Sequence, residues 1–268
     1  MIKEKYKCSF EKIKNLDTKV PINLVLSGGA EKGVAHIALL EKLEELNIKI
    51  NSISACSAGS LVGAMYTSGM KPKEILNFFK NTEIFQFSWI TIAKPGIFNS
   101  SNYARLIDDK IKPTFEDLEI PLIVSTTNLN KGTTEYFNEG SLLKPVLASC
   151  ALPGLFNPVK IGDALYSDGG IIDNFPTTPF KQSEYPIVGS YVVYPSEKTS
   201  EELNTTLKVL AHTSKLLMLS SEEYKFFETY ATICFPLGEF SGFSTKEVDS
   251  IYETAKKYIN KKLEERIN

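Results

Sequence analysis

The chain has 268 residues, of which 43% are hydrophobic and 23% are charged, with 30 Lys and Arg residues against 32 Asp and Glu residues. This composition is typical of a globular protein with a sizeable buried core, and it excludes collagen-like and disordered chains. A net charge near −2 gives no electrostatic reason to expect nucleic-acid binding, which usually needs a basic surface.

The chain has two histidines, His36 and His212, and four widely separated cysteines. No Cys or His pair has zinc-ligand spacing, so we expect no metal site. Any Ser-His-Asp triad must use one of these two imidazoles. The sequence has neither an apolar N-terminal segment of signal-peptide length nor a run of about 18 apolar residues. We therefore expect a cytoplasmic protein without a transmembrane helix, and with its cysteines as free thiols.

The first clear strand pattern covers residues 22–26 and runs directly into a glycine-rich loop at 27–33. A helical spacing of apolar residues follows over 34–46. A short apolar strand at 50–54 then meets a turn of small residues at 55–59, after which a second helical pattern begins. Strand, helix, strand, helix in this order is typical of a parallel sheet covered on both faces.

The second half of the chain returns to a sheet pattern after an aromatic region. Large apolar residues are frequent over 70–115, where proline and glycine predict several short helices, and the aromatic segment 78–98 within it forms either core or a lid. Strands are predicted at 122–125, 134–137 and 186–193. Near the C-terminus, Ser244 and Glu247 form a capping-box pattern that predicts the start of a last, amphipathic helix.

Ser57 lies in the turn between the short strand and the second helix, in the sequence Ala55-Cys56-Ser57-Ala58-Gly59. A serine on a strand-to-helix turn is held in a strained position with its hydroxyl exposed, as in the G-x-S-x-G nucleophile elbow. Here the first glycine is replaced by alanine. This pattern alone fits a nucleophile and a helix cap equally well.

The loop Ser27-Gly28-Gly29-Ala30-Glu31-Lys32-Gly33 follows a strand and precedes a helix. A Walker loop needs Ser or Thr after its lysine, and a dinucleotide loop needs G-x-G-x-x-G, so both phosphate-binding patterns fail. An oxyanion hole and a plain tight turn remain as interpretations. A third element, Asp168-Gly169-Gly170, places a carboxylate just before two glycines, where an isolated pair would indicate only a turn.

These three elements, in this order, resemble the patatin-like phospholipases and acyl hydrolases over about residues 22–195. The segment 148–158, Ala-Ser-Cys-Ala-Leu-Pro-Gly-Leu-Phe-Asn-Pro, matches a fourth motif of that family. The resemblance implies a three-layer α/β/α sandwich with a mostly parallel central sheet. It also implies one domain over 1–268, with a helical C-terminal part at 200–268.

The resemblance further implies a Ser-Asp catalytic dyad, with Ser57 as nucleophile and Asp168 as its partner. Gly28, Gly29 and Ala30 match the oxyanion loop. No metal or cofactor is implied. The implied activity is a serine acyl hydrolase of the phospholipase A or lysophospholipase type. Its partners would be a lipid or acyl-ester substrate and, transiently, a membrane surface.

The chain departs from the family pattern at four positions. Ala55 and Ala30 stand where glycine is usual, and Lys32 and Leu147 stand where arginine is usual. Lys32 is either a contact for a lipid phosphate or a solvated lysine at the start of a helix. Two alternatives stay open. One is a weak or inactive patatin-like lipid-binding protein, and the other is an α/β-hydrolase esterase with a Ser-Asp-His triad, for which chain order leaves only His212.

Overall fold

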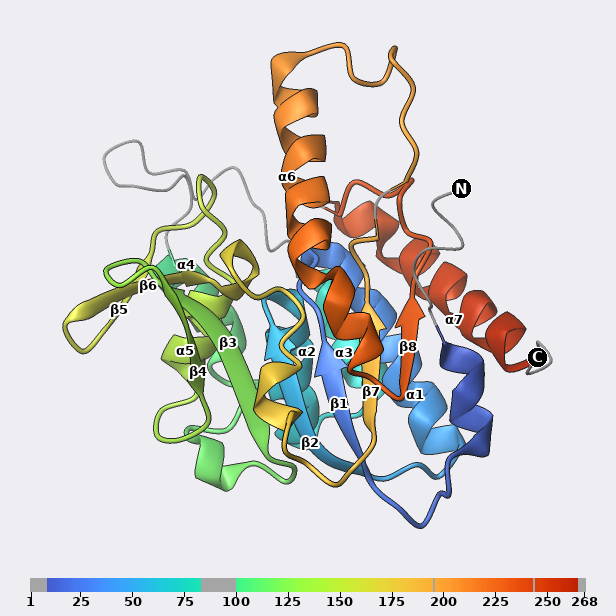
Figure 1. Ribbon diagram of the computed structural model, residues 1–268. Coiled ribbons are helices and arrows are strands. Elements are labelled where there is room, and N and C mark those ends of the chain that lie inside the picture. Colours follow the sequence, from blue (N-terminus) through green and yellow to red (C-terminus); the bar gives the residue numbers. More distant parts are fainter. Residues whose placement is uncertain (1–8, 83–99, 195, 243, 265–268) are drawn as a thin grey trace.

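The computed structural model describes residues 9–82, 100–194, 196–242 and 244–264, and Figure 1 shows a central sheet flanked by helices. The strands are β1 (Ile22–Leu26), β2 (Ile50–Cys56), β3 (Leu122–Asn128), β4 (Thr133–Phe137), β5 (Val159–Ile161), β6 (Ala164–Asp168), β7 (Ile187–Tyr191) and β8 (Ala231–Cys234). The α-helices are α1 (Val34–Glu45), α2 (Ala58–Thr67), α3 (Pro72–Asn81), α4 (Ser100–Ile107), α5 (Leu143–Ser149), α6 (Thr206–Glu222) and α7 (Val248–Glu264).

The sheet has eight strands in the order β5-β6-β3-β2-β1-β7-β8, with β4 paired to β3 off this path. The pairs β3–β2, β2–β1, β1–β7 and β7–β8 are parallel. The pairs β3–β4, β3–β6 and β5–β6 are antiparallel. The parallel centre is formed by the strands predicted from residues 22–26, 50–54, 122–125 and 186–193, which confirms the expected mostly parallel sheet.

Both faces of the sheet are covered, as a continuous apolar central strand requires. All five residues of β1 are buried, and their side chains alternate between two hydrophobic clusters. Leu24 and Leu26 face the larger cluster, which lies among α1, α2, α3, α5 and α7. Val25 faces the smaller one, together with Phe175, Phe226 and residues at the end of α6. The expected three-layer arrangement is therefore confirmed.

Two local predictions need correction or restriction. Ser244 makes no side-chain capping bond, because the Glu247 carboxylate accepts instead from the amides of Ser241 and Gly242, and the predicted capping box is wrong. In the aromatic stretch 78–98, the first two phenylalanines are buried on α3. The stretch from 83 onward lies outside the described residues, and so does the lid hypothesis.

The cysteine prediction is confirmed at two positions and wrong at a third. Cys56 and Cys150 are free thiols, whereas Cys234 is disulfide-bonded. Distance along the sequence does not fix distance in the fold, which is why the spacing of the cysteines misled the prediction. Within the described part of the chain, no helix is long and apolar enough to span a membrane. The same residues contain no cluster of three or more His, Cys, Asp or Glu side chains that could hold a metal ion.

Candidate active site

Ser57 occupies a strained turn between β2 and α2. Its backbone has φ 50° and ψ −124°, in the left-handed half of conformational space that L-residues rarely adopt. The Ser57 amide donates to Ser149 Oγ at 2.8 Å, and that hydroxyl donates to the Ser125 carbonyl at 2.7 Å. A Cβ on Gly59 would lie 2.6 Å from the Leu26 carbonyl oxygen, so only glycine fits there. Packing and hydrogen bonds therefore hold the turn in its strained shape.

Strand β3 brings Ser57 and Asp168 together. Cys56, at the end of β2, pairs with Ser125, while Asp168, at the end of β6, pairs with Thr126. Because β4 occupies the other edge of β3, β2 and β6 share one edge and meet end to end. The two side chains, 111 positions apart in the sequence, are thus attached to neighbouring residues of one strand.

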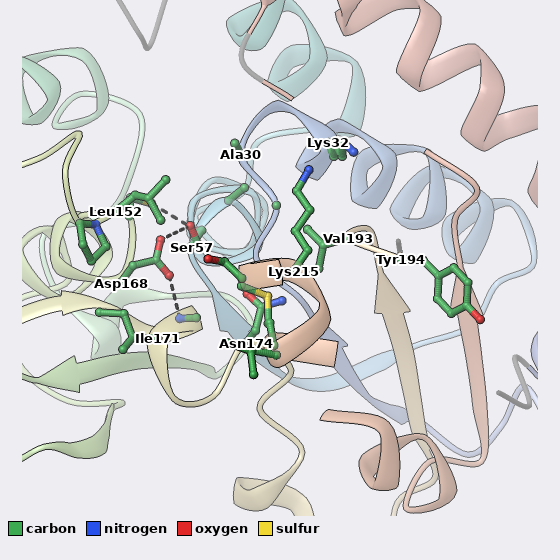
Figure 2. Close-up of a pocket in the computed structure, with 18 of the residues that line it drawn as sticks. Ala30, Lys32, Ser57, Leu152, Asp168, Ile171, Asn174, Val193, Tyr194 and Lys215 are labelled. Atoms are coloured by element: carbon green, nitrogen blue, oxygen red, sulfur yellow. Dashed lines mark hydrogen bonds between the residues drawn. The ribbon is translucent and has the colours of Figure 1, made fainter. Parts of the chain in front are cut away.

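The Ser57 hydroxyl donates to Asp168 Oδ2 at 2.6 Å (Figure 2). The other carboxylate oxygen accepts from the Gly170 amide at 2.7 Å and lies 3.7 Å from the Cys56 thiol. Burial raises the pKa of Asp168 to about 6, against the opposing effect of these hydrogen bonds. At neutral pH the carboxylate is therefore ionised, yet it is a stronger base than an exposed aspartate.

The glycine-rich loop lies directly beside this pair. A Cβ on Gly28 would lie 2.9 Å from the Cβ of Ser57, and one on Gly29 would lie 2.4 Å from a methyl of Val192. The Gly28 amide donates to the Asn174 carbonyl at 3.2 Å. The Gly29 and Ala30 amides have no backbone acceptor among the described residues, so they are the two donors of the loop left for a ligand.

The two alanines that replace glycine behave differently. Ala55 continues β2 and is absent from the residues with positive φ, so its methyl group fits without strain. Ala30 has φ 50°, the region where a methyl group is disfavoured. The departure from the family pattern therefore costs conformational energy at Ala30 only.

Ser57, Asp168, Gly29, Ala30 and Lys32 all line one cavity of about 850 Å³. Figure 2 shows Leu152 and Ile171 on one side of the dyad and two lysines, Lys32 and Lys215, on the other. The remaining apolar lining residues include Leu61, Phe79, Pro153, Phe156, Ile172, Leu217 and Met218. We call the side with Lys32 and Lys215, where Val193 also lies, the cationic part of the cavity, and the side with Leu152 and Ile171 the apolar part; the serine hydroxyl lies between them.

The histidines do not join the dyad. His36 is fully buried on α1, with Nε2 at 2.8 Å from the Ser27 carbonyl and Nδ1 at 2.7 Å from Ser190 Oγ. Burial lowers its pKa to about 4, so the ring is neutral and supports the strand before the glycine loop. His212, on α6, lines the cavity but has no hydrogen bond to Ser57 or Asp168.

Comparison with known proteins extends the match beyond single motifs. A sequence profile described as "Patatin-like phospholipase" matches residues 24–181, which is more than half of the chain. The chain belongs to the patatin-like phospholipase family.

Curated proteins similar in sequence to this patatin-like chain are longer than it, and the similar segment is only part of each. Lysophospholipase NTE1 of Cryptococcus neoformans is 30% identical over 176 residues, which cover 60% of this chain and 10% of that protein. An uncharacterized NTE family protein of Mycobacterium bovis is 30% identical over 162 residues, covering 59% of this chain and 45% of that protein. The chain therefore spans less than half the length of either relative.

One solved structure has a fold similar to that of this chain. VipD from Legionella pneumophila superimposes with a TM-score of 0.63 over 91% of this chain and 66% of that chain, at 14% identity. The shared arrangement of sheet and helices is thus kept at low sequence identity, and this likeness concerns the fold alone.

Ser149 and Asn174 shape the candidate site but were not predicted as site residues. Ser149 and Asn174 lie within or beside the motifs, but only the structure shows that Ser149 accepts from Ser57 and Asn174 from Gly28. Asp173, five residues after Asp168, forms a buried ion pair with Lys225 at 2.6 Å. No spacing in the sequence connects Asp173 with Lys225, because the two lie on separate elements.

Proposed function

We propose that the protein is a serine acyl hydrolase of the phospholipase A or lysophospholipase type, acting through a Ser57–Asp168 dyad. The observation that carries the proposal is the 2.6 Å hydrogen bond from Ser57 Oγ to Asp168 Oδ2, in a cavity next to two unengaged loop amides. A nucleophile within hydrogen-bond reach of its base is the geometry that this chemistry needs.

In the proposed reaction, Ser57 Oγ attacks the ester carbonyl carbon while its proton passes to Asp168. The amides of Gly29 and Ala30 stabilise the oxyanion of the tetrahedral intermediate. When the bond between carbonyl carbon and alkoxy oxygen breaks, Asp168 returns the proton to the departing alcohol. A water molecule then attacks the acyl-serine, gives its proton to Asp168, and the fatty acid leaves as Ser57 regains its hydrogen.

The triad alternative would assign the proton transfer to His212. Against it stands the direct contact between Ser57 and Asp168, which leaves no imidazole between them. His212→Ala decides the point: a dyad enzyme keeps turnover of a short p-nitrophenyl ester within a few-fold of wild type, whereas a triad enzyme loses it by orders of magnitude.

We also propose that the mouth of the cavity touches a membrane surface transiently. Ile171, Ile172 and Leu217 line the cavity and are nevertheless 47%, 40% and 72% exposed. On α6, the exposed Leu210 lies seven positions before Leu217 and therefore on the same face of the helix. A lipid surface is the occupant that fits, because the patch is continuous with the cavity that would receive the lipid. Leu217→Asp should lower binding to phospholipid vesicles, and unchanged binding would contradict the contact.

Fluorophosphonate labelling separates an active enzyme from an inactive lipid-binding relative. The wild-type chain should form a covalent adduct, and Ser57→Ala should not, with an unchanged circular dichroism spectrum showing that the fold is kept. Ser60→Ala is the matched control, because Ser60 is the next serine, on α2, and its hydroxyl bonds to the Ser57 carbonyl and lies 3.8 Å from the Cys150 thiol, with no bond to Asp168. Absence of labelling in the wild type would favour the inactive protein.

A further inference from the structure

The cationic part of the cavity contains a lysine that is buried without a counter-ion. Lys32, in the 3-10 helix η3 (Ala30–Gly33), is 5% exposed. Its stem lies against Gly242, where an added Cβ would be 3.3 Å from both Cγ and Cε. Among the described residues it forms no ion pair and no side-chain hydrogen bond. Burying an unpaired ammonium group is costly, so this position is not the solvated lysine that one sequence interpretation allowed.

A second lysine reaches the same place from a different element. Lys215 extends from α6 toward Lys32 in Figure 2, and it too lines the cavity and has no ion pair within the described residues. Its charge acts on Lys32, whose pKa falls to about 8 because of burial and then of this repulsion. Burial and the charge of Lys198 lower the pKa of Lys215 as well. The fold thus brings the exposed Lys215 close enough to act on the buried Lys32, and Lys32 bears the cost of burial and repulsion.

The neighbouring acids do not neutralise this pair. Glu247 forms no ion pair with Lys32 in the described residues, and its carboxylate is held by the amides of the 241–242 turn; its single negative charge favours the charged form of Lys32 but faces two lysines. Glu31 is buried and its pKa is raised to about 8, so it is mostly uncharged at neutral pH. Lys198, at the edge, has its own partner in Glu202 at 2.7 Å. The remaining positive charge faces the cavity.

The lysines lie on the opposite side of the dyad from the apolar residues Leu152 and Ile171 (Figure 2). An ester whose carbonyl carbon sits at Ser57 would extend its acyl chain into the apolar part. Its alcohol portion would then lie over Lys32 and Lys215. The site therefore distinguishes the two halves of the substrate by charge.

We infer that Lys32 and Lys215 form an anion subsite that selects acyl esters whose alcohol portion carries a phosphate monoester, over uncharged or choline-bearing head groups. The inference rests on the proposed function, because it assumes that an ester occupies Ser57. A phosphate monoester can accept from two ammonium groups at once. The two lysines repel a quaternary ammonium, and among the described lining residues the only carboxylate that could offset this repulsion is Asp168, at the nucleophile.

Binding to the inactive Ser57→Ala variant tests the subsite without turnover. The probes are lysophosphatidate, lysophosphatidylcholine and monoacylglycerol with the same acyl chain, measured by calorimetry below their critical micelle concentrations. We expect lysophosphatidate to bind at least about tenfold more tightly than either of the others, the effect of one or two charge-assisted hydrogen bonds. Equal affinity for the three lipids would overturn the inference.

Lysine variants in the same background locate the effect. Lys32→Gln and Lys215→Gln should each reduce the preference for lysophosphatidate over monoacylglycerol to about threefold or less. Lys208→Gln is the matched control, since Lys208 is exposed on α6, outside the cavity, and donates to Asn204. A preference that persists in the double variant would overturn the inference. The ratio is insensitive to a general loss of folded protein.

Inorganic phosphate separates a lipid head group from a free ion. We expect it to compete only weakly, because it lacks the acyl chain that fills the apolar part. If it bound as tightly as lysophosphatidate, the subsite would serve free phosphate and the lipid assignment would fall. A wild-type chain that hydrolyses no ester, while Ser57→Ala prefers lysophosphatidate, would refute the proposed function and keep the subsite. If the wild-type chain hydrolyses neutral esters and Ser57→Ala shows no preference for lysophosphatidate, the proposed function stands and the anion subsite is refuted.

Discussion

Two buried aspartates lie five residues apart, Asp168 at the end of β6 and Asp173 in the segment that follows it, and they have opposite surroundings. Asp168 and Asp173 are 4% and 5% exposed. Asp173 pairs with Lys225 at 2.6 Å and accepts from the Tyr136 hydroxyl. Lys225 also pairs with Glu222 at 2.6 Å, which accepts from the Asn174 amide. Asp168 has no cationic partner in the described structure, and its donors are a hydroxyl, an amide and a thiol, all neutral.

The difference indicates separate roles for the two carboxylates: Asp173 stabilises the structure through an ion pair, and Asp168 is the proposed general base. Asp173 forms an ion pair with Lys225 and so joins the loop after β6 to the helical turn that follows α6. A buried carboxylate without a cation keeps a higher affinity for protons, and its pKa of about 6 suits a general base near neutral pH. The two aspartates therefore differ in their partners: Asp173 has a lysine beside it, and Asp168, the proposed base, has only neutral donors.

The largest expected effect comes from removing the unpaired carboxylate. Asp168→Asn should lower kcat/KM for a short p-nitrophenyl ester by about 10³–10⁴-fold, because the amide cannot take the Ser57 proton. Asp163→Asn, in an exposed turn before β6, is the matched control and should change little. Near-wild-type turnover by Asp168→Asn would show that another group is the base.

Removing the cation from the paired aspartate should affect stability. Lys225→Met leaves two carboxylates buried without their partner, and we expect the free energy of unfolding in urea to fall by about 3–5 kcal/mol. Lys181→Met removes an ion pair to Glu228 in which the lysine is half exposed, and it should cost less than about 1 kcal/mol. Similar losses in the two variants would contradict the supporting role of the buried network.

Asp168→Asn should also stabilise the protein above neutral pH. Burial raises the pKa of Asp168 from 3.8 to about 6, so the folded chain binds this proton more tightly than the unfolded chain. Stability from this group is therefore present at low pH and is lost as pH rises from about 4 to 6. The gain on substitution should reach about 3 kcal/mol at pH 8 and shrink below about 1 kcal/mol at pH 4. A variant that is less stable at pH 8 would contradict this assignment.

The smallest effect is the shape of the pH profile. With an uncharged ester, kcat/KM should rise about tenfold per pH unit up to an inflection near pH 6 and then level off, as the base form of Asp168 becomes populated. Wild-type initial rates in a constant-ionic-strength buffer series measure it. A profile without an inflection between pH 5 and 7 would contradict a base with this pKa.

The sequence predicted the central part of the fold because its signals are local. Strand-to-helix turns and apolar spacing placed β1, α1, β2 and α7 close to their observed bounds. The resemblance then identified Ser57 and Asp168 as candidates, and the structure shows them in direct contact. The contact itself could not be derived from spacing, because it depends on the register of two strands against β3.

Features that depend on separate elements meeting in space were not predictable. Lys215 lies in a helix without any motif, and nothing near it indicates that it reaches the same cavity as Lys32. The Ser244–Glu247 pattern failed for a related reason. The Glu247 carboxylate can accept from the amide at the start of the helix or from amides of the preceding turn. In the structure it accepts from the amides of Ser241 and Gly242, in the turn.

The way β3 holds the two reacting side chains has a consequence for how the chain can be rearranged. Cys56, next to Ser57, pairs with Ser125, and Asp168 pairs with the following residue, Thr126. The distance between Ser57 and Asp168 is therefore set by one step along β3. The intervening connections contribute length but do not set this distance. A break or insertion in an exposed turn such as that at Gly132, where the backbone is open to solvent, should therefore leave the dyad assembled. A break there would divide the chain into one fragment with Ser57 and another with Asp168, both of which pair with β3.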